Sequence, residues 1–500
     1  MAATITEILK RDILEDLFNR TQNINVNSGD SDRFYLAIGR CEEWDSDLEP
    51  PVPNSGKNDT LQFQASVQSM KLVPDVSYVV PRYNWTAGNQ YEAWDDDYNS
   101  NTVVSATGDI TNPYYVFTDD NNVFVCIQQG RTAQGVVRNS LYKPTDTTGN
   151  PFSAGEDGYI WRFLFNIGAA EARKFLTSNY MPVEKILDSS QGGPALGDLS
   201  VSRLQQLGIQ QAAIPGQMIG IAVDSGGSGY TSRPTITIEP VGLFGVDSVT
   251  PAAAYANIND AGQITEVIMK TDSSQGDSAG GFSFGRDYHD AAIIVSGGGG
   301  TGAKLRALIA SDSGMGANPF KDLNASAIMF NTTLTGDEND DFVTTNDFRQ
   351  IGIIRNPLKD SAQYQSFSGV VGDSAAQDVT LSALKRLHVS SGLISSNITG
   401  DQIVEGTSTA KAIVNSYDAA NQILYVHQTR ETGFKAFDSS DTVTVSEGGG
   451  SAAVVTSAGL PVLRPSEVDK YSGEVLYIDN RSPVTRDNEQ TEDIKVIIDL

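Results

Sequence analysis

The chain has 500 residues, of which 39% are hydrophobic and 19% are charged, so it is long enough for roughly three globular domains. Its 35 basic and 62 acidic residues give a formal net charge of −27, which disfavours binding to nucleic acid or to an anionic membrane surface. The two cysteines, Cys41 and Cys126, lack CxxC spacing and predict neither a disulfide framework nor a thiolate zinc cluster.

The first segment is predicted to be an amphipathic helix. Thr4 and Glu7 have capping-box spacing, and apolar residues recur every three or four positions from Ile5 to Phe18. This apolar stripe could pack on the chain's own core, the commoner case, or on a neighbouring subunit. Charges run through residues 1–21 and no stretch approaches 18 apolar residues, so we expect a protein without a signal peptide or membrane span, kept in a reducing cytoplasm.

The next part of the chain is predicted to form antiparallel sheet. Short aromatic and β-branched runs are broken by Pro, Gly, Asn and Asp, and a polar turn of hairpin length separates two of them. The expected strands are 34–38, 77–80, 114–117, 123–127 and 159–167, and a short helix is expected at 169–176.

Two later segments have the pattern of small β modules. Residues 217–310 contain a weak repeat of strand, glycine-rich turn and strand. Residues 392–458 predict a compact unit of short strands, plausibly a small barrel. Two final strands, 474–478 and 494–500, are expected to complete a sheet elsewhere in the fold.

Two glycine motifs resemble catalytic or phosphate-binding sequences but lack the required flanks. Gly276, Ser278 and Gly280 match GxSxG, yet neither an apolar strand nor a helix adjoins them. Gly297, Gly299 and Gly302 match GxGxxG, but the residues that follow alternate as in a strand instead of opening a helix. Turns are therefore the favoured interpretation of both motifs.

Catalytic, cofactor-binding and metal-binding residues are not expected. The three histidines, His289, His388 and His427, are scattered, which makes zinc binding or histidine acid–base chemistry improbable. Acidic clusters at 95–97, 119–120 and 337–341 could bind calcium, although none has EF-hand spacing. A carboxylate pair for glycoside hydrolysis stays open, because such a pair is defined by its separation in space.

Several segments together resemble the baseplate wedge protein encoded by gene 8 of T-even-type bacteriophages. They include the runs 34–40, 80–86, 112–126, 157–162, 346–354 and 476–492, in that order along the chain. The resemblance covers about residues 1–195, 325–365 and 465–500. We call the following candidates the signature residues: Gly39, Arg40, Trp44, Pro81, Arg82, Trp85, Tyr91, Tyr159, Trp161, Arg349, Gln350 and Arg481.

The resemblance implies a mainly β fold of antiparallel sheets or a sandwich with some α+β elements, carrying an N-terminal amphipathic helix and inserted β modules. It also implies a structural subunit without cofactors, located in the virion's tail baseplate after assembly in the host cytoplasm. The expected partners are other baseplate wedge proteins and a second copy of the chain, with no nucleic acid or membrane. Arginine and tryptophan in the signature suit interfaces, although each tryptophan could equally fill a core.

The expected domains follow from this resemblance and from the stretches that it leaves uncovered. They are an N-terminal helix (1–25), a β-rich core (26–200), an inserted β module (201–320), a return to the core (321–365), a small barrel-like insert (366–460) and closing strands (461–500). The alternative function is a virion-associated protein that binds or cleaves carbohydrate, with a glycan site in the inserts. A secreted adhesin is disfavoured by the expected lack of a signal peptide.

Overall fold

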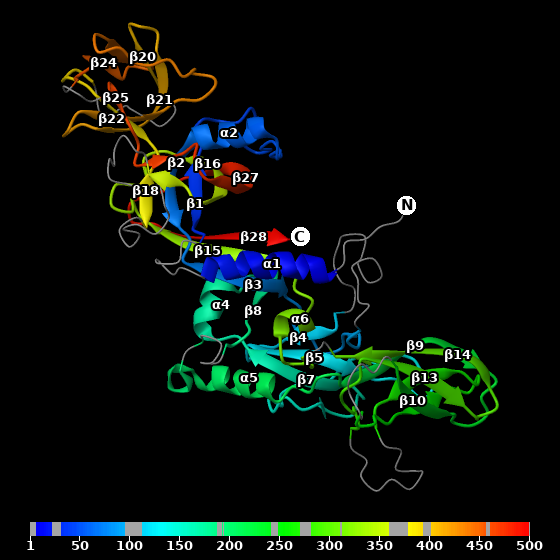
Figure 1. Cartoon of the computed structure of the whole chain (residues 1–500). Helices are drawn as coiled ribbons and strands as arrows, with labels where there is room; N and C mark the ends of the chain where they lie inside the picture. The colour runs from blue at the N-terminus through cyan, green and yellow to red at the C-terminus, as the bar shows by residue number, and fades with distance from the viewer. Residues whose placement is uncertain are drawn as a thin grey trace. The chain divides into compact units, whose positions relative to one another are not determined.

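The computed structural model divides the chain into two compact units. Unit 1 combines Met1–Val76 with Ile328–Leu500, and unit 2 is Ser77–Ala327. Strands greatly outnumber helices in both (Figure 1), which confirms the predicted mainly β fold with antiparallel sheets. The structure describes residues 7–22, 32–95, 113–187, 193, 195–241, 249–270, 282–310, 313–359, 379–393, 402–456 and 461–499.

Helices are few and short apart from the first. Helix α1 confirms the predicted N-terminal helix, although Thr4 of its expected capping box lies outside the described residues. Its Leu14 is fully buried, whereas Ile8, Leu9 and Ile13 are exposed. The helices are α1 (Glu7–Gln22), α2 (Lys57–Ser66), α4 (Ala169–Phe175), the 3-10 turn η2 (Leu196–Asp198), α5 (Val201–Gln211) and α6 (Pro319–Asp322).

A five-stranded antiparallel sheet forms the centre of unit 1. Its order is β18-β2-β1-β16-β27, and β1 pairs with β16 from Phe34↔Arg355 to Gly39↔Gln350. Helix α2 packs on the sheet through Phe63, which is fully buried beside Tyr35 and Met70. The strands are β18 (Thr380–Ser382), β2 (Val67–Leu72), β1 (Phe34–Gly39), β16 (Phe348–Arg355) and β27 (Glu474–Val484).

The second sheet of unit 1 has seven strands in the order β24-β23-β20-β21-β22-β19-β25. Its two sides also meet: Val389 bridges Val454, and Ser390 donates its N–H to the Ala453 carbonyl. We call this sheet the barrel. Its strands β19 and β25 lie outside the predicted residues 392–458, and the other five lie within them. The strands are β19 (Lys385–His388), β20 (Ile403–Gly406), β21 (Lys411–Asp418), β22 (Ile423–His427), β23 (Thr442–Val445), β24 (Gly450–Ala453) and β25 (Leu463–Arg464).

The remaining strands of unit 1 lie outside these two sheets. Strand β28 (Thr491–Asp499) lies beside β15 (Ala327–Thr335), and β17 (Leu358–Lys359) pairs with β26 (Val468–Asp469). The predicted C-terminal strands therefore both exist, and they add to different sheets.

Unit 2 begins with the predicted hairpin. Strands β4 and β5 pair antiparallel and meet at Phe117↔Val123, and β7 and β6 complete a four-stranded sheet in the order β4-β5-β7-β6. Helix α5 supplies Ile209 to the aromatic core on this sheet. Strands β3 and β8 also pair antiparallel. The strands are β3 (Asp75–Pro81), β4 (Tyr115–Phe117), β5 (Asn122–Gln128), β6 (Phe152–Ser153), β7 (Ile160–Asn166) and β8 (Tyr180–Val183).

The repeat predicted at 217–310 forms one interlocked module. Strand β9 pairs with β14, while β10 pairs with β13 in the sheet β12-β11-β10-β13, so neither predicted half closes as a hairpin on itself. The glycine-rich turns lie side by side, because Thr231 donates its N–H to the Gly298 carbonyl. The strands are β9 (Met218–Ser228), β10 (Thr235–Val241), β11 (Tyr255–Ile258), β12 (Ile264–Ile268), β13 (Asp290–Ser296) and β14 (Thr301–Ile309).

The structure describes one of the two glycine motifs. Gly297, Gly299 and Gly302 all have positive φ and lead into strand β14, as their alternating neighbours predicted. A helix N-terminus for a phosphate is therefore missing from this motif. Gly276, Ser278 and Gly280 lie outside the described residues.

Candidate functional site

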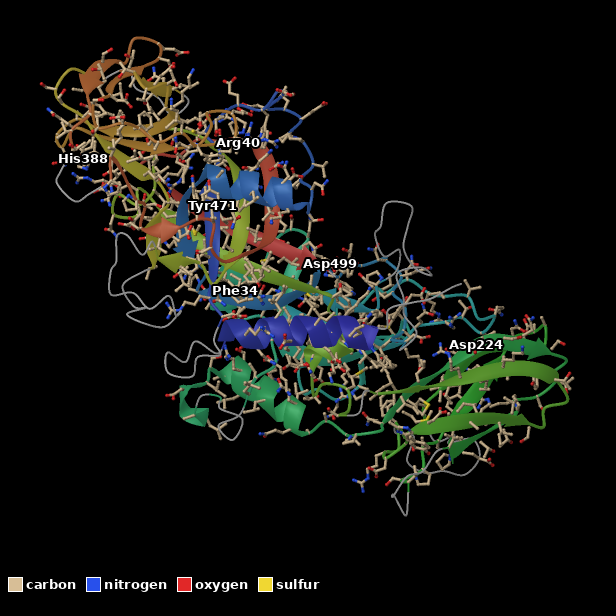
Figure 2. The ribbon with its side chains drawn as sticks, turned by 45° about the horizontal axis from the view of Figure 1, so that its top comes forward. Phe34, Arg40, Asp224, His388, Tyr471 and Asp499 are labelled. Atoms are coloured by element: carbon tan, nitrogen blue, oxygen red, sulfur yellow. The ribbon has the colours of Figure 1, made fainter. Side chains whose placement is uncertain are left out.

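The signature residues form two groups, one in each unit. Unit 1 holds Gly39, Arg40, Trp44, Arg349, Gln350 and Arg481, and unit 2 holds Pro81, Arg82, Trp85, Tyr91, Tyr159 and Trp161. Figure 2 labels Phe34 and Arg40, which mark the start of β1 and the residue that follows it.

Arg349 organises the loop after β1. Its guanidinium donates to the Cys41 carbonyl over 2.7 Å and holds both oxygens of Asp47, the closest at 2.8 Å. The hydrogen bonds from Arg349 lower the pKa of the Asp47 carboxyl. Arg349 is 5% exposed, so this planar donor fork is largely removed from water.

The same loop is held at its tryptophan. The Arg40 guanidinium lies 3.8 Å from the centroid of the Trp44 ring, and the indole N–H donates to the Arg481 carbonyl over 3.1 Å. The Arg481 side chain instead contacts Asp479 at 3.3 Å. Arg40, Trp44 and Arg481 therefore fix one loop conformation.

Gly39 and Gln350 join β1, α2 and β16. A Cβ on Gly39 would lie 2.6 Å from the Ser66 carbonyl oxygen, so only glycine allows this approach. The Gln350 side chain accepts from the Ser66 hydroxyl at 2.8 Å and donates to the Asn480 side chain at 2.7 Å. These residues support the fold of unit 1.

In unit 2 the signature aromatic residues make a buried cluster. The Tyr91 and Trp161 rings meet edge to face at 5.4 Å, and Tyr159 stacks on Trp161 at 5.8 Å. The Tyr159 hydroxyl donates to the Arg138 carbonyl over 2.7 Å, and burial raises its pKa. This cluster is a core.

The run from Pro81 to Trp85 lies along the β4–β5 hairpin. Tyr115 donates its hydroxyl hydrogen to the Pro81 carbonyl, and the Arg82 guanidinium lies 4.8 Å from the Phe117 ring centroid. The Trp85 N–H donates to the Phe117 carbonyl over 2.8 Å, while its indole N–H donates to the Ser140 hydroxyl over 3.2 Å. These contacts fix the run on the sheet.

The acidic clusters pair with cations of the chain itself. Lys143 contacts Asp119 and Asp120 at 2.6 and 2.8 Å. Lys71 contacts Glu338 at 2.6 Å, within the 337–341 cluster. Asp95 contacts Arg306 at 2.7 Å, while residues 96–97 lie outside the described residues.

Unit 2 contains a cavity of about 540 Å³, lined by the module at 217–310 together with residues from 92–95 and 127–135. Aromatic side chains from two places in the sequence line it: Trp94, and Phe282 with Phe284. Acidic residues also line it, and each has a polar partner within the chain: Gln129 donates to Glu92, Asn257 donates to Glu266, and Arg306 lies between Asp95 and Asp224. Figure 2 labels Asp224 in this part of the chain. Signature residues do not line this cavity.

A second polar site lies inside unit 1. It contains Cys41, Glu42 and His427, whose sulfur, carboxylate and imidazole ligand atoms all lie within 4.8 Å of one another. Cys41 and Glu42 follow β1, and His427 ends β22 in the barrel. The sequence alone does not point to this group, because 385 residues separate Glu42 from His427. The fold alone brings them together.

Burial and neighbouring charges shift the pKa values of ionisable groups in and near this site. Burial favours a raised pKa for Glu42, but the attraction and hydrogen bond of His427 outweigh it and lower the pKa to about 2. The nearby Lys470 donates to the Ala65 carbonyl, and its burial lowers its pKa to about 7. By contrast, the other cysteine, Cys126, is fully buried in unit 2, and burial raises its pKa well above the usual range of a thiol.

A buried carboxyl is also found in unit 2. Asp322 accepts the Gly316 N–H at 2.7 Å and is near the Arg162 guanidinium, yet burial raises its pKa to about 7. It stands apart from the signature residues and supports the loop before α6.

No protein-family model and no curated protein matches this chain. Among the described residues, every helix is too short or too polar to cross a lipid bilayer.

Proposed function

We propose that the chain is a structural subunit of a phage tail baseplate wedge, acting through contacts with other wedge proteins and with a second copy of itself. The ordered resemblance of its signature segments to the gene 8 wedge protein carries this proposal. The signature residues also serve packing and loop support instead of gathering around the 540 Å³ cavity of unit 2, which fits a scaffold better than a reaction centre.

The loop held by Arg349 offers a contact surface. Its Leu48 and Val52 side chains are 91% and 92% exposed, although the loop itself is tied down through Asp47 and Trp44. Apolar side chains on a fixed loop bury area on association without a large ordering cost. Exposed Ile8, Leu9 and Ile13 on α1 add a second apolar surface.

The first experiment locates the chain in the phage particle. Antibody-gold labelling of purified tails should place it at the baseplate, and cross-linking mass spectrometry should join it to other wedge proteins. Absence from purified particles would contradict the proposal.

The second experiment tests the loop. The double variant Leu48→Asp and Val52→Asp should remove incorporation into wedges while leaving thermal unfolding unchanged, because both side chains are exposed. Val201→Asp, at an 84% exposed position in unit 2, is the matched control and should assemble normally. Normal assembly of the double variant would exclude this loop as a contact.

The alternative of a carbohydrate-binding protein draws support from the cavity in unit 2, since sugars stack on aromatic side chains beside polar groups. The internal pairing of its acidic residues weakens that alternative, because each carboxylate already has a partner. Glycan-array binding that is lost in Phe282→Ala, but kept in Phe434→Ala at an exposed site in unit 1, would favour it over the structural role.

A further inference from the structure

The buried group in unit 1 has the composition of a transition-metal site. It combines a thiol, a carboxylate and an imidazole, of which Cys41 is 4% exposed, His427 is 0% exposed and the Glu42 side chain is 16% exposed. Sulfur and imidazole nitrogen favour zinc, whereas calcium and magnesium favour oxygen ligands alone.

Asn415 orients two members of this group at once. The amide is fully buried, and its Nδ2 donates to Cys41 Sγ over 3.5 Å. Its Oδ1 consequently faces His427 Nδ1 at 2.6 Å and accepts the proton of that nitrogen. His427 Nε2 is thereby directed at the carboxylate, to which it hydrogen-bonds over 3.3 Å, and a bound metal ion would take the place of the proton between them. A second side chain that fixes the tautomer of a histidine ligand is typical of zinc sites.

The distances are compatible with tetrahedral coordination. Zinc bonds of about 2.0–2.2 Å to nitrogen and oxygen place those two atoms about 3.4 Å apart at the tetrahedral angle. His427 Nε2 lies 3.3 Å from Glu42 Oε1, and Cys41 Sγ lies 3.9 Å from Glu42 Oε2. These two distances involve different oxygens of the Glu42 carboxylate. The sulfur, imidazole and carboxylate ligand atoms all lie within 4.8 Å of one another, so a modest rearrangement would let them share one ion.

We propose that Cys41, Glu42 and His427 bind a zinc ion, with Asn415 as a positioning residue. The ion would join the segment after β1 to the end of β22, and so fasten the barrel to the central sheet within unit 1. Water would complete the coordination from the partly exposed side of Glu42. Because the ligands come from distant parts of the chain, zinc binding is coupled to folding of this unit.

The first test uses the full chain, stripped with a chelator and titrated with zinc. One equivalent should bind, measured by elemental analysis and competition with a chromophoric chelator, and the unfolding temperature should rise. Cobalt should give tetrahedral ligand-field bands and a thiolate-to-cobalt charge-transfer band. The chain has only two cysteines, so a band that persists in Cys126→Ser must come from Cys41.

The variants give the second test. Cys41→Ser should remove the charge-transfer band, and Asn415→Ala should weaken zinc binding by roughly 10- to 100-fold, as is usual for a group that orients a ligand. His388→Gln is the matched histidine control and should bind as the unmodified chain does. If the folded full chain binds less than one zinc, or if cobalt gives no thiolate band, the site is a metal-free His427–Glu42 ion pair and the proposal is overturned.

Discussion

The contacts of Arg349 lead to a prediction about a single side chain. Arg349→Ala removes the donor to the Cys41 carbonyl and the partner of Asp47, and should lower the free energy of unfolding by about 2 kcal/mol. Arg349→Lys should recover only part of this loss, because an ammonium group lacks the planar fork. Urea unfolding followed by circular dichroism measures both.

Arg481→Ala is the control for that prediction. The Arg481 side chain is 43% exposed and its ion pair with Asp479 is at the surface, so the change should cost less than about 0.5 kcal/mol. Equal losses for Arg349→Ala and Arg481→Ala would show that burial of the Arg349 fork contributes nothing.

Asp322 gives a pH-dependent prediction. Its pKa of about 7 in the folded chain is above that of an unfolded aspartate, so the folded state retains a proton that the unfolded chain releases. Stability should therefore fall as the pH rises from about 4 to 7. Asp322→Asn lacks this titration. Its free energy of unfolding, relative to that of the unmodified chain, should therefore increase by up to about 4 kcal/mol over the same pH range.

Unfolding curves of both proteins at several pH values measure the effect. Asp290→Asn, at an exposed position of the same unit, is the control and should follow the unmodified chain. A constant difference between Asp322→Asn and the unmodified chain across the range would mean that Asp322 is already ionised when folded.

At the residue scale the sequence has limited power to locate the buried polar site. Scattered histidines made zinc improbable when only spacing along the chain was considered, yet His427 lies beside Glu42 in the fold. Residues brought together from the segment after β1 and from the end of β22 leave no local motif in the sequence. The neighbouring pair Cys41–Glu42 was the one signal available, and a pair of ligands alone is not specific.

Among the elements, the contact between α2 and β16 depends on Gly352. An added Cβ would lie 2.2 Å from Phe63 Cζ and 2.8 Å from the Tyr477 carbonyl oxygen. Gly352→Ala should therefore destabilise the chain by about 1–3 kcal/mol through overpacking. Thermal unfolding measures the change.

Gly208→Ala in α5 is the contrasting substitution, since open space surrounds that position within a helix. This substitution should raise the free energy of unfolding by about 0.5–1 kcal/mol, because alanine restricts the conformations of the unfolded chain. A neutral Gly352→Ala would mean that α2 shifts readily on the sheet.

Strand existence was predictable, whereas strand pairing was not. Alternating or continuous apolar runs locate β1, β5 and β22, because these patterns reflect burial that is local in sequence. The pairing of Phe34 with Arg355 joins residues from distant parts of the chain, and no local pattern encodes it. For the same reason, the repeat in the sequence did not predict that β9 pairs with β14 and that β10 pairs with β13.

For the whole molecule, the formal charge of −27 sets how the proposed dimer should respond to salt. Two equally acidic copies repel each other, and raising the ionic strength from about 0.01 M to 0.15 M shortens the Debye length from about 30 Å to about 8 Å. Dimerisation through apolar surfaces should therefore strengthen several-fold over this range, as sedimentation equilibrium can measure. Binding to a basic wedge partner should weaken over the same range. A chain that stays monomeric in both conditions would contradict the dimer, and a dimer that dissociates as salt is added would mean that complementary charges hold the two copies together.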